Sequence, residues 1–205
     1  MAYAKETICV QGSYDGRDCY GAVSYPIYQS ATYAHPALGE TTGYAYGRVA
    51  NPTRNELQKT VALLEHGTEA LAFSTGMAAI SAVFELLDLG DHMIATDDIY
   101  GGTLRLWSSI GKKNGLLADS VDTTDLEKLE AAIRPNTKAI FLETPSNPMM
   151  KVTDIRGAAE IAKKHGCILI VDNTFLSPYF QQPLDLGADI VVHSGTKYLG
   201  GHGLC

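Results

Sequence analysis

The sequence predicts an α/β fold in which a mostly parallel sheet is flanked by helices on both faces. From residue 53 onward, stretches with the apolar spacing of a helix alternate with short apolar runs that are typical of buried strands. Right-handed crossovers through the helices then place successive strands in one parallel sheet. The composition agrees, because 45% hydrophobic and 19% charged residues are enough to bury a core.

The expected elements follow one another along the chain. Each expected strand is a short apolar run, and the six runs lie at 69–74, 92–98, 116–121, 139–145, 167–174 and 188–196. Each expected helix has its apolar residues on one face, and the five stretches lie at 53–66, 77–89, 103–115, 124–135 and 155–166. The expected N-caps are Thr53 and Thr124, and the expected helix stops are Gly67, Gly90 and Pro135.

The first 52 residues lack this rhythm and contain eight of the eleven tyrosines. A compact domain rarely keeps about fifty residues without regular structure, so we expect this irregular arm either to be disordered or to lie on a surface. Its aromatic content favours the surface of a partner, and the alternative is an arm that wraps on its own domain. The sequence therefore predicts an N-terminal arm over residues 1–52 and an α/β domain over residues 53–205.

Charge and composition exclude several classes of function. Sixteen basic against 23 acidic residues give a net charge of −7, which argues against a nucleic-acid partner. Lys5 and Glu6 stand where a signal peptide would be apolar, and no apolar run approaches about 18 residues, so no membrane segment is expected. Scattered cysteines, with Cys167 inside an apolar run, favour a reducing compartment and a cytoplasmic protein. The histidines lack metal-ligand spacing, so no metal is expected.

Polar residues follow the expected strands, where ligands collect in an open α/β sheet. A turn with Gly76 and Met77 opens a helix after the first strand and would present backbone N–H groups to an anion. Tyr100 follows the second strand, and its ring could stack on a flat ligand. Glu143 and Asn147 lie on a proline-bounded turn after the fourth strand.

The last two strand ends add an acid and an amine. Asp172 directly follows a strongly apolar strand, where a carboxylate needs a cationic partner. The last strand is followed by Ser194, Thr196 and Lys197, whose hydroxyls suit a phosphate and whose amine, if partly buried, is nucleophilic. Each feature alone has a bland interpretation as packing or surface chemistry. Together they form the set that a pyridoxal phosphate (PLP) site requires. No G-x-G-x-x-G or P-loop pattern supports a nucleotide site instead.

Several long strings carry a resemblance to a known family. GYAYGRVANPTR, FSTGMAAI, DDIYGGT, ETPSNP and VDNTFLSPYFQQPLDLGADIVVHSGTKYLGGH resemble the Cys/Met-metabolism (trans-sulfuration) family of PLP-dependent enzymes. The resemblance covers nearly the whole chain, from about the tenth residue. It implies the large domain of the aminotransferase-like fold, fold type I, and PLP as the cofactor.

The resemblance also implies roles for individual residues. Lys197 resembles the lysine that forms a Schiff base with the cofactor and then acts as general base, and Asp172 the acid on the pyridine nitrogen. Tyr100 resembles the stacking ring, and Asn147 the amide near the 3′-oxygen of the cofactor. The implied phosphate ligands are the N–H groups of Gly76 and Met77, the hydroxyls of Ser194 and Thr196, and Tyr46 and Arg48 from the arm of a neighbouring subunit. A homo-oligomer, a tetramer in the family, is therefore implied.

The implied activity is elimination or replacement at Cβ or Cγ of sulfur amino acids or activated homoserine. The string Ile99, Tyr100, Gly101, Gly102 stands where methionine γ-lyases have a string that resembles IYGC, so Gly102 argues against that activity and favours the cystathionine γ-synthase and cystathionine lyase group. The alternative enzymes are an O-acetylhomoserine sulfhydrylase and a methionine γ-lyase. The family continues beyond the lysine with a C-terminal domain and an arginine for the substrate carboxylate. This sequence stops at Cys205, so we expect that domain to be absent, and the alternative function is a truncated, non-catalytic PLP-binding fragment.

Overall fold

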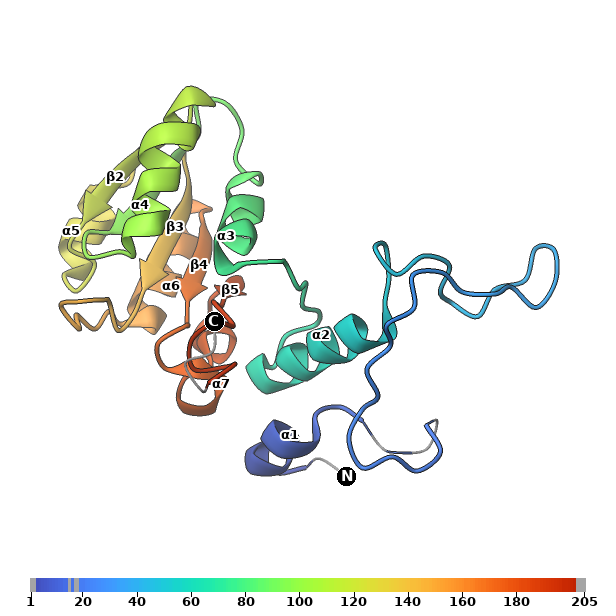
Figure 1. The fold of residues 1–205 in the computed structure, drawn as a ribbon. Coiled ribbons are helices and arrows are strands. Elements are labelled where there is room, and N and C mark those ends of the chain that lie inside the picture. The colour runs from blue at the N-terminus through green and yellow to red at the C-terminus, as the bar shows by residue number, and fades with distance from the viewer. Residues whose placement is uncertain (1–2, 15, 17–18, 202–205) are drawn as a thin grey trace. The chain divides into compact units, whose positions relative to one another are not determined.

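The computed structural model describes residues 3–14, 16 and 19–201 of the chain. The chain forms two compact units, Met1–Ala72 and Phe73–Cys205. The elements of both units are labelled in Figure 1. The division falls after Ala72, so the helix that begins at Pro52 groups with the N-terminal unit. The expected boundary after residue 52, between an N-terminal arm and an α/β domain, stays a prediction.

The C-terminal unit is built on a five-stranded sheet in which all neighbouring strands are parallel, as expected. The order across the sheet is β2-β1-β3-β4-β5. The strand bounds are β1 His92–Thr96, β2 Leu117–Val121, β3 Thr137–Glu143, β4 Ile168–Asp172 and β5 Ile190–Val192. Four of these strands lie inside an expected apolar run, and β3 begins at Thr137, two residues before the expected start at 139. Strands that are covered on both faces read as continuous apolar segments.

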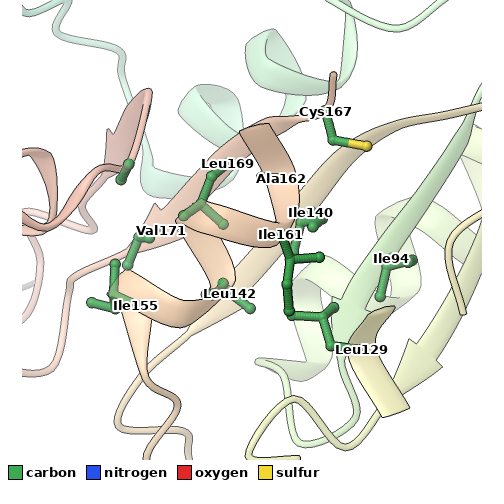
Figure 2. Close-up of a cluster of buried hydrophobic side chains, with 12 residues drawn as sticks. Ile94, Leu129, Ile140, Leu142, Ile155, Ile161, Ala162, Cys167, Leu169 and Val171 are labelled. Carbon is green, nitrogen blue, oxygen red and sulfur yellow. The ribbon is translucent and has the colours of Figure 1, made fainter. Parts of the chain in front are cut away.

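Helices cover both faces of this sheet, which confirms the predicted fold class. On one face, Ile94, Ile140 and Leu142 pack with Leu129 of α5 (Leu126–Ala131) and with Ile161 of α6 (Ile155–His165), as Figure 2 shows. The intervening strand residues point the other way, as the two-residue period of a strand requires. There, Met93, Ala95 and Phe141 pack with α3 (Gly76–Phe84), and Trp107, at the end of α4 (Gly101–Leu106), packs against this cluster.

One expected strand is absent and one helical stretch is irregular. Residues 69–74 form no strand, and among the described residues none pairs with them. An apolar run becomes a strand only where a neighbour satisfies its backbone groups, so this prediction was wrong. The helical stretch at 103–115 exists, but it begins at Gly101 and continues from α4 into a π-helical segment, η1 (Trp107–Gly111). Two short helices, α7 (Ser177–Phe180) and η2 (Pro183–Leu186), lie between β4 and β5.

The helix caps differ from two of the expectations. α5 is capped by Asp125 rather than Thr124, because the Asp125 carboxylate accepts from the N–H groups of Glu127 and Lys128. α2 (Pro52–Glu65) is capped by Asn51 rather than Thr53. α6 is capped in the same way by Asp154. In each helix the residue directly before the first helical residue accepts, through its side-chain oxygen, from free N–H groups of the first turn.

The N-terminal unit contains more regular structure than expected. A short helix, α1 (Lys5–Gln11), precedes the irregular segment. That segment is tied to the start of α2: the Asn51 amide donates to the Tyr28 carbonyl at 3.0 Å, and the Tyr28 N–H donates to Thr53 Oγ1 at 2.8 Å. Thr53, the expected cap, therefore anchors the arm instead. Among the described residues, no helix has both the length and the apolar composition needed to cross a bilayer.

Candidate functional site

The candidate site lies at the carboxyl ends of β1, β3, β4 and β5. β1 pairs with β2 on one side and with β3 on the other, so the chain changes direction across the sheet between β1 and β3. Ligands in open parallel sheets bind outside the carboxyl ends of the strands at such a switch point. The polar residues singled out after these strands are therefore brought to one edge by the topology alone.

Two buried carboxyl groups lie side by side at this edge. Glu143 ends β3, Asp172 ends β4, and the two are paired in the register of the strands. They are 8% and 7% exposed. The pKa of Glu143 is raised to about 7, chiefly because the carboxyl group is buried. The negative charges of Asp172 and Asp98 also raise this pKa. The backbone N–H groups of Tyr100 and Asn147 lower it, because they donate hydrogen bonds to the ionised form. Burial also raises the pKa of Asp172, although Thr174 opposes this by hydrogen bonding, its N–H lying 3.0 Å from Oδ1.

Tyr100 follows β1 and lies against the start of two helices. Its backbone N–H donates to Glu143 Oε2 at 2.8 Å. Its side chain is half exposed and lies directly over Gly102, where an added Cβ would come 2.9 Å from Tyr100 Cζ and 3.0 Å from Met77 Sδ. Gly102 therefore leaves room for the ring, and this ring and Met77 meet beside the first turn of α3.

The first turn of α3 contacts the loop that follows β5. Thr75 caps the helix by accepting from the Ala78 N–H at 3.0 Å, so Gly76 and Met77 are the first residues of α3, where backbone N–H groups lack a partner within the helix. A Cβ added at Gly76 would lie 2.9 Å from Ser194 Cβ and 3.1 Å from Ser194 Oγ. Because Gly76 has no side chain, the N-terminus of α3 can lie close to the Ser194 hydroxyl.

The loop after β5 carries Ser194, Thr196 and Lys197. Ser194 is held by its backbone N–H, which donates to Thr174 Oγ1 at 2.8 Å, two residues after Asp172. The Lys197 N–H closes a turn by donating to the Ser194 carbonyl at 3.1 Å. Ser194 and Thr196 are partly buried, whereas Lys197 is exposed. Partial burial, the condition under which the sequence makes this amine nucleophilic, is therefore not met by the described side chains around the loop.

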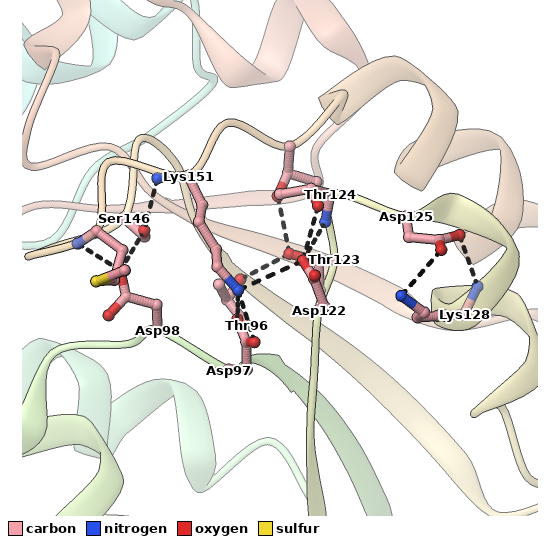
Figure 3. Close-up of polar contacts among 12 residues, drawn as sticks. Thr96, Asp97, Asp98, Asp122, Thr123, Thr124, Asp125, Lys128, Ser146 and Lys151 are labelled. Atoms are coloured by element: carbon pink, nitrogen blue, oxygen red, sulfur yellow. Dashed lines mark hydrogen bonds and ion pairs between the residues drawn. The ribbon is translucent and has the colours of Figure 1, made fainter.

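The turn after β3 carries Asn147, whose side chain is exposed. Its neighbour Ser146 is fully buried and donates from Oγ to Asp98 Oδ2 at 2.5 Å. Lys151, at the far end of the turn, donates from Nζ to Asp97 Oδ2 at 2.8 Å, and Figure 3 shows both contacts. The turns after β1 and β3 are therefore fastened to each other by their side chains.

Tyr46 and Arg48 lie in the N-terminal unit. The Arg48 guanidinium stands over the Tyr46 ring at 4.7 Å from its centroid, a cation–π contact that holds the two side chains together. Within its own unit the pair is presented on the segment just before Asn51. Their expected contact with a cofactor phosphate stays a prediction.

The residues at the sheet edge fit PLP. Asp172 is a buried acid that a protonated pyridine nitrogen would pair with, and the cost of burying an unpaired carboxylate gives a reason for such a partner. The close approach of Gly76 to Ser194 forms a small cradle of N–H and hydroxyl donors suited to a phosphate. The Tyr100 ring beside them is partly free to stack. No group of three or more potential metal ligands occurs in the part of the chain that the structure describes.

Sequence reasoning noted Glu143 without giving it a role and missed Asp98 and Ser146. Glu143 is the residue that ties Tyr100 to β3, and its buried position at a strand end was the available signal. Asp98 was visible as the second of two adjacent acids in DDIYGGT. Its bond to Ser146 joins strands that are far apart in sequence, so no local pattern could indicate it.

Comparison with known proteins identifies the family. Over residues 6–205 the chain matches the family described as Cys/Met metabolism PLP-dependent enzyme, and it belongs to that family. It is 56% identical over 198 residues to a cystathionine gamma-lyase of Bacillus subtilis, covering 97% of this chain and 52% of that protein. It is 50% identical over 201 residues to a cystathionine gamma-synthase of Haemophilus influenzae, covering 98% of this chain and 54% of that protein.

A solved structure agrees with these relatives. The fold is similar to that of cystathionine gamma-lyase from Lactobacillus plantarum complexed with L-serine, with a TM-score of 0.94 and 47% identity. The match covers 98% of this chain and 53% of that one. The chain thus spans about half the length of the proteins that it matches. These matches confirm the predicted family, its PLP cofactor and the aminotransferase-like fold.

Proposed function

We propose that this protein acts, with PLP, as a trans-sulfuration enzyme at Cβ or Cγ of sulfur amino acids or activated homoserine. The observation that carries the proposal is the buried Asp172 at the carboxyl edge of the sheet, beside the loop that bears Ser194 and Lys197. Relatives named cystathionine gamma-lyase, beta-lyase and gamma-synthase support this reaction class. The cofactor, when bound, supplies an electron sink for the charge that develops at Cα.

The residues of this chain would then divide the work. Asp172 holds a proton on the pyridine nitrogen, since a buried carboxylate gains most from a charged partner. Lys197 would hold the cofactor through its side-chain amine and would act as the general base for the proton on Cα of the substrate. Tyr100 stacks on the ring and Asn147 reaches the 3′-oxygen. Gly76 and Met77 donate their N–H groups, and Ser194 and Thr196 their hydroxyls, to the phosphate.

We also propose that the protein is a homo-oligomer, as in the tetrameric members of the family. Tyr46 and Arg48 would then reach the phosphate in a neighbouring subunit. Exposed apolar side chains on the N-terminal unit, such as Val10 and Leu38, support a role of this unit in assembly.

We further propose that the protein works in a reducing compartment, the cytoplasm. The described cysteines Cys9, Cys19 and Cys167 are free thiols, which supports this location.

The test combines binding and turnover. Purified protein is titrated with PLP and followed by visible absorbance, and cystathionine or activated homoserine with cysteine is then supplied. We expect a yellow protein that releases a keto acid and ammonia, or forms cystathionine. A yellow protein without turnover on any of these substrates would reduce the function to cofactor binding, and a colourless protein would contradict the proposal.

Matched variants make the test specific. Lys197→Ala is expected to abolish the absorbance band that the bound cofactor gives the wild-type protein. Lys113→Ala, at an exposed position just after η1, serves as the control and should keep it. Release of a keto acid from cystathionine with no gain from added cysteine assigns a lyase, whereas cystathionine formation assigns a synthase.

A further inference from the structure

Asp98 fastens two turns that each carry an expected site residue. Its Oδ2 accepts from Ser146 Oγ at 2.5 Å and from the backbone N–H of Met149 at 2.8 Å. Asp98 lies two residues before Tyr100, and Ser146 and Met149 flank Asn147. One carboxylate oxygen therefore sets the distance between the ring after β1 and the amide after β3.

Ser146 closes its own turn while it is held by Asp98. Its backbone N–H donates to the Lys151 carbonyl at 2.9 Å, and its Oγ accepts from the Lys151 N–H at 3.0 Å. Its side chain is fully buried, so its hydroxyl depends on these protein partners rather than on water. Hydrogen bonds to a charged acceptor are about twice as strong as neutral ones. The bond from Ser146 Oγ to the Asp98 carboxylate is therefore stronger than the bond that Ser146 Oγ accepts from the Lys151 N–H.

Other contacts join the same strands without passing through Asp98. Lys151 bridges Asp97 and Asp122, and the buried hydroxyls of Thr123 and Thr96 lie 3.1 Å apart, as Figure 3 shows. The Thr123 hydroxyl also contacts the Thr153 hydroxyl at 2.8 Å. These contacts hold the strand ends together at the level of the sheet. The bond from Asp98 lies further out, at the level of Asn147, so its loss should alter the site without unfolding the unit.

We propose that Asp98 is a positioning residue of the site, one that fixes Asn147 relative to Tyr100 by holding Ser146 and Met149. The role rests on the proposed PLP function, and Asp98 would act through Ser146 and Met149 rather than by direct contact with the cofactor. Glu143 holds the backbone N–H of Tyr100 in the opposite direction, from β3 to the turn after β1. Asp98 thus orders the turn after β3, and Glu143, the last residue of β3, orders the turn after β1.

The test compares Asp98→Ala with a control that loses the same kind of contact elsewhere. Asp125→Ala removes a carboxylate that accepts two backbone N–H groups at the start of α5, away from the sheet edge. Three readouts are needed: hydrogen exchange of residues 146–151, the dissociation constant of PLP, and visible circular dichroism per bound cofactor at saturation. The last reports the orientation of the cofactor, which a loss of stability alone does not change.

We expect Asp98→Ala to speed exchange at Met149 at least tenfold, to weaken PLP binding about tenfold and to reduce the dichroism per bound cofactor. Asp98→Asn should restore most of each, because its amide oxygen can accept both hydrogen bonds. Asp125→Ala should leave all three readouts at the wild-type values. Should Asp98→Ala fail to fold, Ser146→Ala removes one of the two bonds, and we expect it to change the readouts in the same direction.

Two results would overturn the proposal. In the first, Asp98→Ala matches Asp125→Ala in the exchange of residues 146–151. In the second, exchange rises while PLP affinity and dichroism stay at wild-type values, which would make the link purely structural. A wild-type protein that binds no PLP contradicts the proposed function separately, because the exchange measurement needs no cofactor.

Discussion

The two units of the chain are held together in different ways. In the sheet unit, Phe141, Ile94 and Leu142 are fully buried between strands and helices. In the N-terminal unit, the buried hydrophobic residues among those described are Tyr14, Cys19, Ala62 and Leu64. Meanwhile Val10 is 91% exposed and the Leu38 side chain projects entirely into solvent. The sheet unit has its own core, whereas the N-terminal unit depends on hydrogen bonds and aromatic edges around α2.

This difference indicates what each unit needs from its surroundings. Burial of apolar surface supplies most of the free energy of folding, so the sheet unit can order the site residues without help. Tyrosine rings of the N-terminal unit pair with one another, and Tyr14 and Tyr25 do so edge to face with ring centroids 5.2 Å apart. Such pairs add only about 0.5–1.5 kcal/mol each. We therefore expect the N-terminal unit to gain its full order against another surface, in keeping with the proposed oligomer.

The largest expected effect is a cavity in the core of the sheet unit. Phe141 is fully buried and meets the Phe84 ring at 6.2 Å between centroids. Phe141→Ala should lower the free energy of unfolding by about 3–5 kcal/mol in urea titrations. Leu38→Ser, in the N-terminal unit, should change it by no more than about 0.5 kcal/mol. Equal effects of the two substitutions would refute the contrast between the units.

The next effect is a pH dependence that belongs to the sheet unit alone. Glu143 has a pKa of about 7 in the folded protein against a usual value of 4.5, so between these values the folded state binds more protons than the unfolded state. Stability from this group is then fully present below pH 4.5 and is lost as the pH rises through 7. We expect the loss to reach about 3 kcal/mol, measured by urea unfolding across this range.

Glu143→Gln should remove this part of the pH dependence. The difference in unfolding free energy between Glu143→Gln and wild type should therefore shift in favour of the variant as the pH rises. Glu127→Gln, on the exposed side of α5, is the control and should keep the wild-type profile. A profile of Glu143→Gln that runs parallel to wild type between pH 4 and 8 would contradict the assigned ionisation.

A smaller effect is expected at the contact between α3 and the loop after β5. Gly76→Ala places a Cβ 2.9 Å from Ser194 Cβ, so the loop must shift, at a cost of about 1–3 kcal/mol. PLP binding, followed by absorbance, should weaken at the same time. Gly101→Ala is a matched control at the start of α4, because nothing lies within 4 Å of its added Cβ. If both variants bind PLP as wild type does, the cradle at Gly76 is not the phosphate site.

The smallest effect should be confined to the N-terminal unit. Asn51→Ala removes the cap of α2 and the bond to the Tyr28 carbonyl, at a local cost of about 1 kcal/mol. Hydrogen exchange should quicken in residues 25–50 and stay unchanged in the sheet. Asp154→Ala, which removes the cap of α6, should quicken hydrogen exchange in the sheet unit and leave it unchanged in residues 25–50. Changes that spread through both units after either substitution would show one cooperative structure.

Much of the fold could be predicted from the sequence because the strands are buried on both faces. The run AIFLE in β3 has no polar face, and its length excludes a helix. The run at 69–74 has a similar composition but no described partner, and pairing is not encoded in a run by itself. The predicted caps were wrong for a related reason. Asn51 and Thr53 are both good N-cap residues, and only the geometry of the chain decides which side-chain oxygen reaches the free N–H groups of α2.

The site was predictable where the topology alone determines it. Tyr100 lies in the turn after β1 and Asp172 ends β4, so the parallel strands bring both residues to the same edge of the sheet. The bonds that hold them could not be predicted, since the Asp98–Ser146 contact depends on the path of two turns. The exposure of Lys197 was also out of reach, because it depends on what covers the loop after β5.

The central claim is that the carboxyl edge of the sheet holds PLP through Lys197. The direct measurement is to incubate the protein with PLP, reduce it with sodium borohydride, digest it and map the modified peptide by mass. We predict a pyridoxyl group on Lys197 and none on this peptide in Lys197→Ala. Modification on another lysine with Lys197 untouched, or no stable modification at all, would contradict the account.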